Sequence, residues 1–170
     1  MILFSSLSSS IIFDFNKNSS INNWLVVDDV VMGGRSTGNF KLSKDGNGVF
    51  YGNVSLENNG GFASFRYRTK NLNVNKEQKI RMVVIGDSKE YQIRIKPSQN
   101  IRYTYSKTFK TTNSKQIIEI PLSEFTAQFR GYKLNMENFD FDKIEEFGIL
   151  VGNKKNEEFR LEIIDIEFIN

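Results

Sequence analysis

The sequence contains no cysteine and no histidine. Without cysteine, the chain cannot form a disulfide, a zinc–thiolate site or an iron–sulfur cluster. Without histidine, it has no imidazole acid or base and no catalytic triad built on one. Catalysis would have to use Asp, Glu, Lys, Tyr or Ser, and a bound metal would be a hard cation held by oxygen ligands. We therefore expect no cofactor.

Dense basic runs and long apolar runs are also missing. The net charge is +3, but the basic residues are scattered among acidic ones, which argues against a nucleic-acid partner. No stretch approaches the roughly 20 apolar residues that a membrane-spanning helix needs, so we expect no membrane span. Residues 1–15, MILFSSLSSSIIFDF, lack the basic segment and the long apolar core of a signal peptide. The sequence thus predicts a cytoplasmic protein.

Only two prolines occur in 170 residues and no Pro/Ser-rich linker divides the chain, so we expect a single domain over residues 1–170. Phenylalanine, which favours strands, occurs 15 times. Apolar and polar residues alternate, as in half-buried strands, over residues 49–56, 80–84, 91–95, 101–105, 118–120, 147–151, 159–163 and 164–168. Turn-forming residues separate many of these segments, which predicts an all-β sandwich or barrel with very little helix.

Local signals refine this prediction. The alternation changes parity at Ile163–Ile164, which predicts a β-bulge. Single helical turns are expected at Ser123–Gln128, where Ser123 could act as a cap, and at Asp142–Glu146. The segment Asn58-Asn59-Gly60-Gly61-Phe62 carries a strong hairpin-turn signal. Its alternative role is to present asparagine side chains to a ligand at a sheet edge.

The segment 28–36, DDVVMGGRS, combines acids, glycines and an arginine in the manner of a functional loop. Its glycine spacing matches neither the dinucleotide-binding motif nor the P-loop, and no helix pattern follows it, which argues against a phosphate site. Adjacent acids on a strand point to opposite faces, so Asp28 and Asp29 are poorly placed to share a calcium ion.

An architectural role for this segment is the interpretation that we favour. Gly33-Gly34 would form a tight bend with positive φ angles, and Arg35 would contact one of the two aspartates or a neighbouring backbone carbonyl. We also expect Val30 or Val31 to be buried beside the single tryptophan, Trp24.

A second candidate site comprises Arg66, Arg94 and Arg102 with Tyr103 and Tyr105. If these arginines face the same way, they form a basic sheet surface flanked by aromatic rings. Such a surface could bind a sugar, a polyanion or a protein, since Arg and Tyr are frequent at interfaces. The alternative is an ordinary solvated face of the sandwich.

Two aspartates lie inside the terminal apolar segments, Asp14 in IIFDF and Asp165 in EIIDIEF. If both pointed inward from neighbouring strands, their carboxylates could hold a structural calcium ion. The period of two also allows both side chains to face solvent, in which case no metal would bind.

Several segments together resemble the complex I intermediate-associated protein 30 family. They are Trp24 with VVDDVVMGGRS, then GVFYGNVSLENNGGFASFRYR, YQIRIK, YSKTFKTT, IEIPLSEFTAQFRGYKL, FGILVGN and FRLEIIDIEFI. The resemblance runs from about Ile12 to Ile169. The motif positions that carry over are Trp24, Asp28, Asp29, Met32, Gly33, Gly34, Arg35, Ser36, Asn58, Gly60, Gly61, Phe62, Arg66, Arg130 and Gly131.

The resemblance implies a galactose-binding-like jelly-roll sandwich, similar to some carbohydrate-binding modules. In mitochondrial members, it implies a role in assembling respiratory complex I. The composition of this chain, rich in Asn, Lys, Ile and Phe, would suit a low-GC bacterial source. We expect these positions, with Asn59, Arg94, Arg102 and Tyr103, to form the binding residues, and we expect no catalytic residue among them.

Three functions can be compared on this basis. A non-catalytic binding or assembly module acting through protein contacts, with respiratory-complex subunits as candidate partners, fits the resemblance and the lack of an acid–base motif. The alternative is a carbohydrate-binding module that uses the concave sheet face, which predicts a cleft with aligned Tyr or Trp rings. A glycosidase would need two carboxylates roughly 5–9 Å apart, for which no motif is present, so we do not expect an enzyme.

Overall fold

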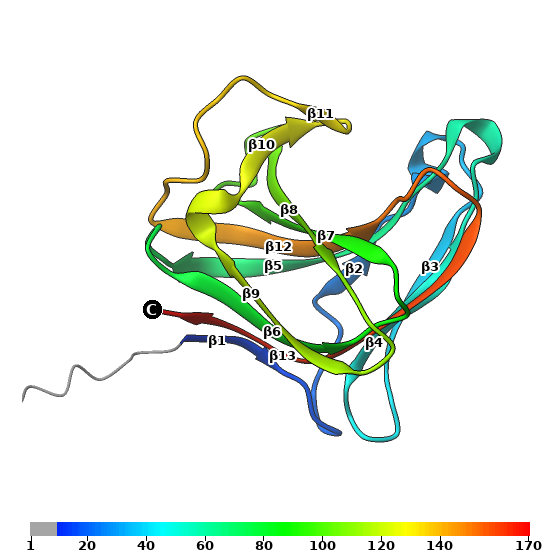
Figure 1. Cartoon of the computed structure of the whole chain (residues 1–170), viewed down its shortest axis with the longest axis horizontal. Coiled ribbons are helices and arrows are strands. Elements are labelled where there is room, and N and C mark those ends of the chain that lie inside the picture. Colours follow the sequence, from blue (N-terminus) through cyan, green and yellow to red (C-terminus); the bar gives the residue numbers. More distant parts are fainter. Residues whose placement is uncertain (1–9) are drawn as a thin grey trace, which may run out of the picture.

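Two antiparallel sheets pack face to face and form a β-sandwich of the jelly-roll type (Figure 1). The computed structural model describes residues 10–170. In strand order, the first sheet runs β3-β4-β13-β6-β9, with β1 also paired to β13, and the second runs β11-β10-β8-β7-β12-β5-β2. The predicted all-β fold with very little helix is confirmed.

The element bounds are as follows. The six-stranded sheet contains β1 (Ser10–Asp14), β3 (Thr37–Leu42), β4 (Gly48–Val54), β6 (Lys79–Ile85), β9 (Lys115–Pro121) and β13 (Glu157–Ile169). The seven-stranded sheet contains β2 (Trp24–Val26), β5 (Ala63–Asn73), β7 (Glu90–Lys96), β8 (Thr104–Lys110), β10 (Thr126–Phe129), β11 (Tyr132–Lys133) and β12 (Lys143–Val151). Short 3₁₀ helices lie at η1 (Asp29–Met32), η2 (Glu57–Asn59) and η3 (Leu122–Glu124).

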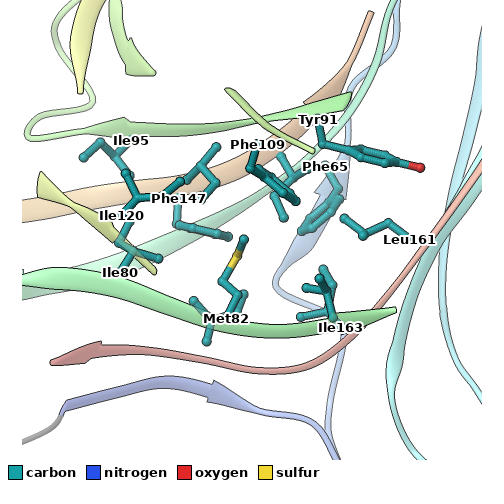
Figure 2. Packing of buried hydrophobic residues seen from close by; sticks show 14 of the residues in the cluster. Phe65, Ile80, Met82, Tyr91, Ile95, Phe109, Ile120, Phe147, Leu161 and Ile163 are labelled. Atoms are coloured by element: carbon teal, nitrogen blue, oxygen red, sulfur yellow. The ribbon is translucent and has the colours of Figure 1, made fainter. Parts of the chain in front are cut away.

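Large apolar side chains from both sheets fill the space between them (Figure 2). The seven-stranded sheet contributes Phe65, Tyr91, Ile95, Phe109 and Phe147, and the six-stranded sheet contributes Ile80, Met82, Ile120, Leu161 and Ile163. These residues occupy alternate positions in their strands, as the sequence pattern predicts. The intervening residues of β5, β7 and β12 therefore point away from the core and form the outer face of the seven-stranded sheet.

The predicted bulge is confirmed, one predicted helical turn is found in part, and two local predictions are wrong. The pairing of β13 with β6 shifts register between Ile163 and Asp165. A helical turn does follow Pro121, but as η3 it spans Leu122–Glu124 and no side chain caps it. The other predicted turn, Asp142–Glu146, is absent because residues 143–146 belong to β12. There, pairing with β5 buries Ile144 and overrides the local turn signal. The strand expected at 101–105 begins at Thr104, because residues 97–103 connect β7 to β8.

The hairpin predicted at Asn58–Gly61 is also wrong. Strand β4 pairs with β3 and β13 in one sheet, whereas β5 pairs with β12 and β2 in the other. The segment between them therefore crosses from one sheet to the other. Asn58 and Asn59 adopt positive φ angles of 55° and 59°, conformations that asparagine tolerates better than most residues. The crossing places η2 beside the loop that contains η1.

No helix among residues 10–170 is long and apolar enough to cross a membrane.

Candidate functional site

The carboxylate of Asp29 is the centre of the DDVVMGGRS segment. Its side chain is fully buried and accepts hydrogen bonds from the Ser36 backbone N–H at 2.9 Å and the Ser36 hydroxyl at 2.5 Å. It also accepts bonds from the backbone N–H groups of Gly61 at 2.6 Å and Phe62 at 3.2 Å. One buried acid thus joins the η1 loop to the segment that follows η2.

Glycines make room for this carboxylate. A Cβ atom added at Gly34 or at Gly60 would overlap the Asp29 side chain. Gly33 has a different role, because it ends η1 with a φ of +88° and no neighbouring atom within 4 Å of an added Cβ. The sequence predicted a positive φ angle for both glycines, but of the two only Gly33 has one. Gly34 is needed because the Asp29 carboxylate lies where its side chain would be.

Folding shifts the pKa values of the neighbouring Asp28 and Asp29 in opposite directions. For Asp29, burial raises the pKa, but the hydrogen bonds from Ser36, Gly61 and Phe62 outweigh burial and hold the pKa below its ordinary value. For Asp28, burial dominates and raises the pKa, although its carboxylate accepts a 2.7 Å bond from the Gly38 N–H. Asp29 is therefore a stable buried anion that organises the loop.

The segment is architectural through Asp29, but the specific contacts predicted for Arg35 and the valines are wrong. Arg35 forms a 2.6 Å ion pair with Glu57 instead of contacting Asp28 or Asp29. The backbone and hydroxyl donors around Asp29 already fill its acceptor positions, which leaves the arginine to pair at the surface. Val30 and Val31 are 59% and 74% exposed rather than buried beside the tryptophan.

Trp24 lies in the core instead of at a binding surface. Its ring is 4.7 Å from that of Tyr67 and 5.2 Å from that of Phe40, measured between centroids. Tyr105 is buried as well, and Tyr103 packs against it with ring centroids 5.8 Å apart. None of these rings lines the groove described next, in the part of the chain that the structure covers.

A groove of about 620 Å³ crosses the outer face of the seven-stranded sheet. Its lining comprises Val27, Val31, Met32, Gly61, Phe62, Arg66, Gln92, Arg94, Lys96, Arg102, Thr104, Gln128, Phe129, Arg130, Gly131, Glu146, Leu150, Gly152 and Lys154. Arg66, Arg94 and Arg102 thus line one surface, which is the arrangement that the sequence left open beside an ordinary solvated face. Lys96, Arg130 and Lys154 also line the groove, and Glu146 is the single carboxylate among the described lining residues. The groove is therefore strongly cationic.

The floor of the groove follows the strand register across β5, β12 and β7. Gly148 of β12 is the register partner of Arg66 on one side and Arg94 on the other. Two residues earlier, Glu146 lies in the same way between Arg68 and Lys96. Neighbouring strands are about 4.8 Å apart, so each row brings its side chains within reach of one another.

Amide groups fix the position of Arg94. The Nε and Nη2 atoms of Arg94 donate to Gln92 Oε1 at 3.3 and 3.1 Å. The same oxygen accepts a 3.3 Å bond from the Gln128 side chain of β10. Burial, and then repulsion from Arg66, lower the pKa of Arg94 to about 10, so its guanidinium remains charged at neutral pH.

Exposed apolar side chains stand at the two margins of the groove. Val31 and Met32, which follow the edge strand β2, are 74% and 62% exposed at one margin. Phe129 of β10 is 39% exposed near the other edge of the same sheet, where β10 and β11 rise at the top of the view in Figure 1. The guanidinium of Arg130 lies 5.3 Å from the Phe129 ring centroid. An apolar rim thus flanks a charged floor.

The structure separates the predicted binding residues into two groups. Those that line the groove are Met32, Gly61, Phe62, Arg66, Arg94, Arg102, Arg130 and Gly131. Those that lie elsewhere are Trp24, Asp28, Asp29, Gly33, Gly34, Arg35, Ser36, Asn58, Asn59, Gly60 and Tyr103. The sequence analysis missed Gln92, Gln128, Glu146 and Leu150, although the period of two could have identified at least the outward positions of β7 and β12.

The candidate calcium pair has a positive charge beside it. Asp14 and Asp165 are register partners on β1 and β13, but the Arg81 guanidinium lies 3.6 Å from the Asp165 carboxylate and supplies positive charge there. Burial raises the pKa of Asp165, and Arg81 partly opposes this shift. Among residues 10–170, no cluster of three acidic side chains suited to a metal ion occurs.

Comparison with known proteins places this geometry in context. The family model described as Complex I intermediate-associated protein 30 (CIA30) matches residues 13–163. The mitochondrial Complex I intermediate-associated protein 30 of Drosophila melanogaster is 25% identical over 188 residues. That match covers 96% of this chain but only 64% of the fly protein, so the chain spans less than two thirds of its relative.

Solved structures share the fold. The family 11 carbohydrate-binding module of Clostridium thermocellum, in complex with a β-1,3-1,4-mixed-linked tetrasaccharide, matches with a TM-score of 0.71 and 19% identity over 98% of both chains. The agarase AgWH50C matches with a TM-score of 0.62 and 11% identity over 95% of this chain and 24% of the agarase. At such identities these matches establish a common fold and carry no statement about ligands.

Proposed function

Since the chain belongs to the complex I intermediate-associated protein 30 family, we propose that it is a non-catalytic module that binds a protein partner through the groove on its seven-stranded sheet. Family membership supports a role like that of an assembly factor. Subunits of respiratory complex I are accordingly the first partners to test. A cytoplasmic site of action remains a prediction that cell fractionation would check.

The exposed apolar margin is the observation that carries this proposal. Val31 and Met32 are held in solvent at the edge of a groove, although burying either side chain would be worth about 1.5–3 kcal/mol. Adjacent exposed apolar residues next to a polar floor are typical of protein interfaces. The buried Asp29 network holds the loop in this exposed conformation, so the margin is fixed before a partner arrives.

Catalysis has less support from the groove. Glycoside hydrolysis needs two carboxylates, and Glu146 is the single one among the described lining residues. Its Oε2 atom lies 3.8 Å from Arg68 Nε, so an arginine rather than a second carboxylate stands beside it.

Sugar binding is a second candidate, supported by the amide and guanidinium groups of the floor. Gln92, Gln128 and Arg94 are planar partners that sugar hydroxyls can use. The stacking platform is weaker, because Phe62 and Phe129 are the aromatic side chains in the described lining, without Tyr or Trp. A glycan array with no binding at high protein concentration would remove this candidate.

A pull-down with matched variants tests the protein-binding proposal. The double variant Met32→Ser/Phe129→Ser alters both margins, whereas Ile117→Ser alters a 57% exposed residue on β9 of the other sheet. We expect the wild type and Ile117→Ser to recover the same partner at stoichiometric levels from the source cell, and the double variant to lose it. Equal recovery by all three proteins would count against the groove as the binding surface.

A further inference from the structure

The rows of the groove floor differ in how their charges are balanced. In one row Glu146 supplies a carboxylate between Arg68 and Lys96. In the next row Gly148 supplies no side chain, and Arg66 and Arg94 flank it with two positive charges. Both rows therefore place a basic residue on each side of β12, but only the row of Glu146 has a carboxylate between them.

The Arg66–Arg94 pair has no counter-charge of its own. Among residues 10–170, neither guanidinium lies within 4.0 Å of a carboxylate oxygen, whereas Arg68 has Glu146. Arg94 uses Nε and Nη2 to bind Gln92, and its Nη1 group has no acceptor in the described chain. Arg66 likewise has no acceptor there. Both side chains therefore retain donors for an incoming oxyanion.

There is room for such an anion above Gly148. A pocket of about 20 Å³ is lined in part by Arg66, Arg94 and Gly148, and it shares both arginines with the larger groove. This volume accommodates roughly one water-sized atom, such as a single carboxylate oxygen, and the remainder of the group would lie in the groove. The Gln128–Gln92–Arg94 chain holds one guanidinium in place, which lowers the entropy lost on binding.

We propose that Arg66 and Arg94 bind a carboxylate over Gly148, and that the carboxylate belongs to an acidic side chain of the protein partner. This inference rests on the proposed function for the source of the carboxylate. Arginine forms bidentate bonds to a carboxylate, and two arginines on one anion strengthen the contact. Lys96 and Glu146 line the same pocket with opposite charges, so the two guanidiniums supply the net positive charge that an incoming carboxylate meets. The apolar margins fit neighbouring apolar side chains of the same acidic segment.

Blocked peptides provide a direct test that needs no identified partner. The probes are acetyl-LELEL-amide, acetyl-LQLQL-amide and inorganic phosphate, titrated into the whole chain by calorimetry and by NMR of the arginine Nε–H signals. We expect the Glu peptide to bind at least about tenfold more tightly than the Gln peptide, corresponding to about 1.4 kcal/mol. The side-chain signals of Arg66 and Arg94 should shift with the Glu peptide, and this readout needs no variant to fold.

Variants then assign the site. Arg66→Gln and Arg94→Gln should each weaken binding of the Glu peptide about tenfold or more, and Arg94→Lys should restore only part of it, because lysine lacks the planar fork. Arg160→Gln, on an exposed position of β13 beside Glu162, is the matched control and should bind as the wild type does.

The possible outcomes are distinct. Equal binding of the Glu and Gln peptides, wild-type affinity in both arginine variants, or binding of phosphate alone would overturn the inference. If the Glu peptide binds as expected but no cellular protein is recovered, the carboxylate site stands and the proposed function fails. If a partner is recovered but binds Arg66→Gln and Arg94→Gln normally, the function stands and this inference fails.

Discussion

Asp29 accepts two hydrogen bonds from Ser36, one from its backbone N–H at 2.9 Å and one from its hydroxyl at 2.5 Å. The Ser36 hydroxyl in turn accepts a 2.9 Å bond from the Ser55 N–H at the end of β4. Through these bonds the loop after β2 is tied to the segment that leads from β4 to β5. The exposed conformation of Val31 and Met32 depends on this buried junction.

Replacing Asp29 should destabilise the chain more than replacing any exposed acid. Asp29→Ala leaves the buried donors of Ser36, Gly61 and Phe62 without an acceptor, and we expect a loss of at least about 3 kcal/mol in the free energy of unfolding. Urea denaturation followed by circular dichroism measures this value. Glu57→Ala is the control, because its ion pair with Arg35 is exposed. Similar losses in the two variants would contradict a central role for Asp29.

Lowering the pH should reveal that folding shifts the pKa values of Asp28 and Asp29 in opposite directions. The pKa of Asp29 is lowered by folding, so its contribution to stability is complete above its ordinary pKa near 3.8 and is lost as the pH falls through the lower folded value. The pKa of Asp28 is raised, so its contribution is present in acid and is lost as the pH rises. Between about pH 7 and about pH 3.5, Asp29→Asn should lose less stability than the wild type and Asp28→Asn should lose more. Urea midpoints at the two pH values give the comparison, and identical pH dependence in all three proteins would refute it.

The two glycines of the signature should respond differently to alanine. Gly33→Ala meets no neighbouring atom and is opposed only by its φ of +88°, at about 1–2 kcal/mol. Gly34→Ala places a methyl group where the Asp29 carboxylate lies, so the hydrogen bonds of Asp29 must break and the loss should reach about 3 kcal/mol or more. Thermal and urea unfolding of both variants would rank them. The reverse order would show that backbone strain, rather than room for Asp29, determines this sequence.

Trp24 should behave as a core residue. Trp24→Ala should cost about 3–5 kcal/mol, whereas Trp24→Phe should cost less, because it keeps a ring among Tyr67 and Phe40 and removes a buried indole N–H that has no acceptor in the described chain. The intrinsic fluorescence of this single tryptophan should report folding. An emission maximum typical of water-exposed indole in the folded protein would disprove the burial.

The Arg35–Glu57 pair should contribute little to stability. Its side chains are 65% and 60% exposed, and such pairs are worth less than about 1 kcal/mol. A double-mutant cycle with Arg35→Gln and Glu57→Gln measures the coupling directly. A coupling well above that value would show that the pair does lock the loop, as the sequence predicted for Arg35 with a different partner.

The fold was predictable because a period of two is local information. Strands such as β7 bury Tyr91, Ile93 and Ile95 and place the residues between them on the outer face, where they are only partly buried, so the pattern itself identifies both faces. The bulge at Ile163 was predictable for the same reason. The assignment of β4 and β5 to different sheets was not, because an Asn-Gly turn signal is the same for a hairpin and for a crossing between sheets.

The site was predictable only in part, because it depends on register between distant strands. That Arg66 and Arg94 flank Gly148 follows from the pairing of β5 and β7 with β12, which no local pattern specifies. Similarly, the partner of Arg35 could not be inferred from its proximity in sequence to Asp28 and Asp29. Twenty-two positions separate it from Glu57, and the crossing segment brings the two together.

The margins of the groove lie near opposite edges of one sheet, at Met32 after β2 and at Phe129 in β10, which pairs with the edge strand β11. A change in the twist of that sheet would change the distance between Met32 and Phe129. Since the chain contains no cysteine, thiols introduced at these two positions would be the sole sites for a pair of spectroscopic labels. The molecule is therefore ready for distance measurements that follow the width of its groove while a partner binds.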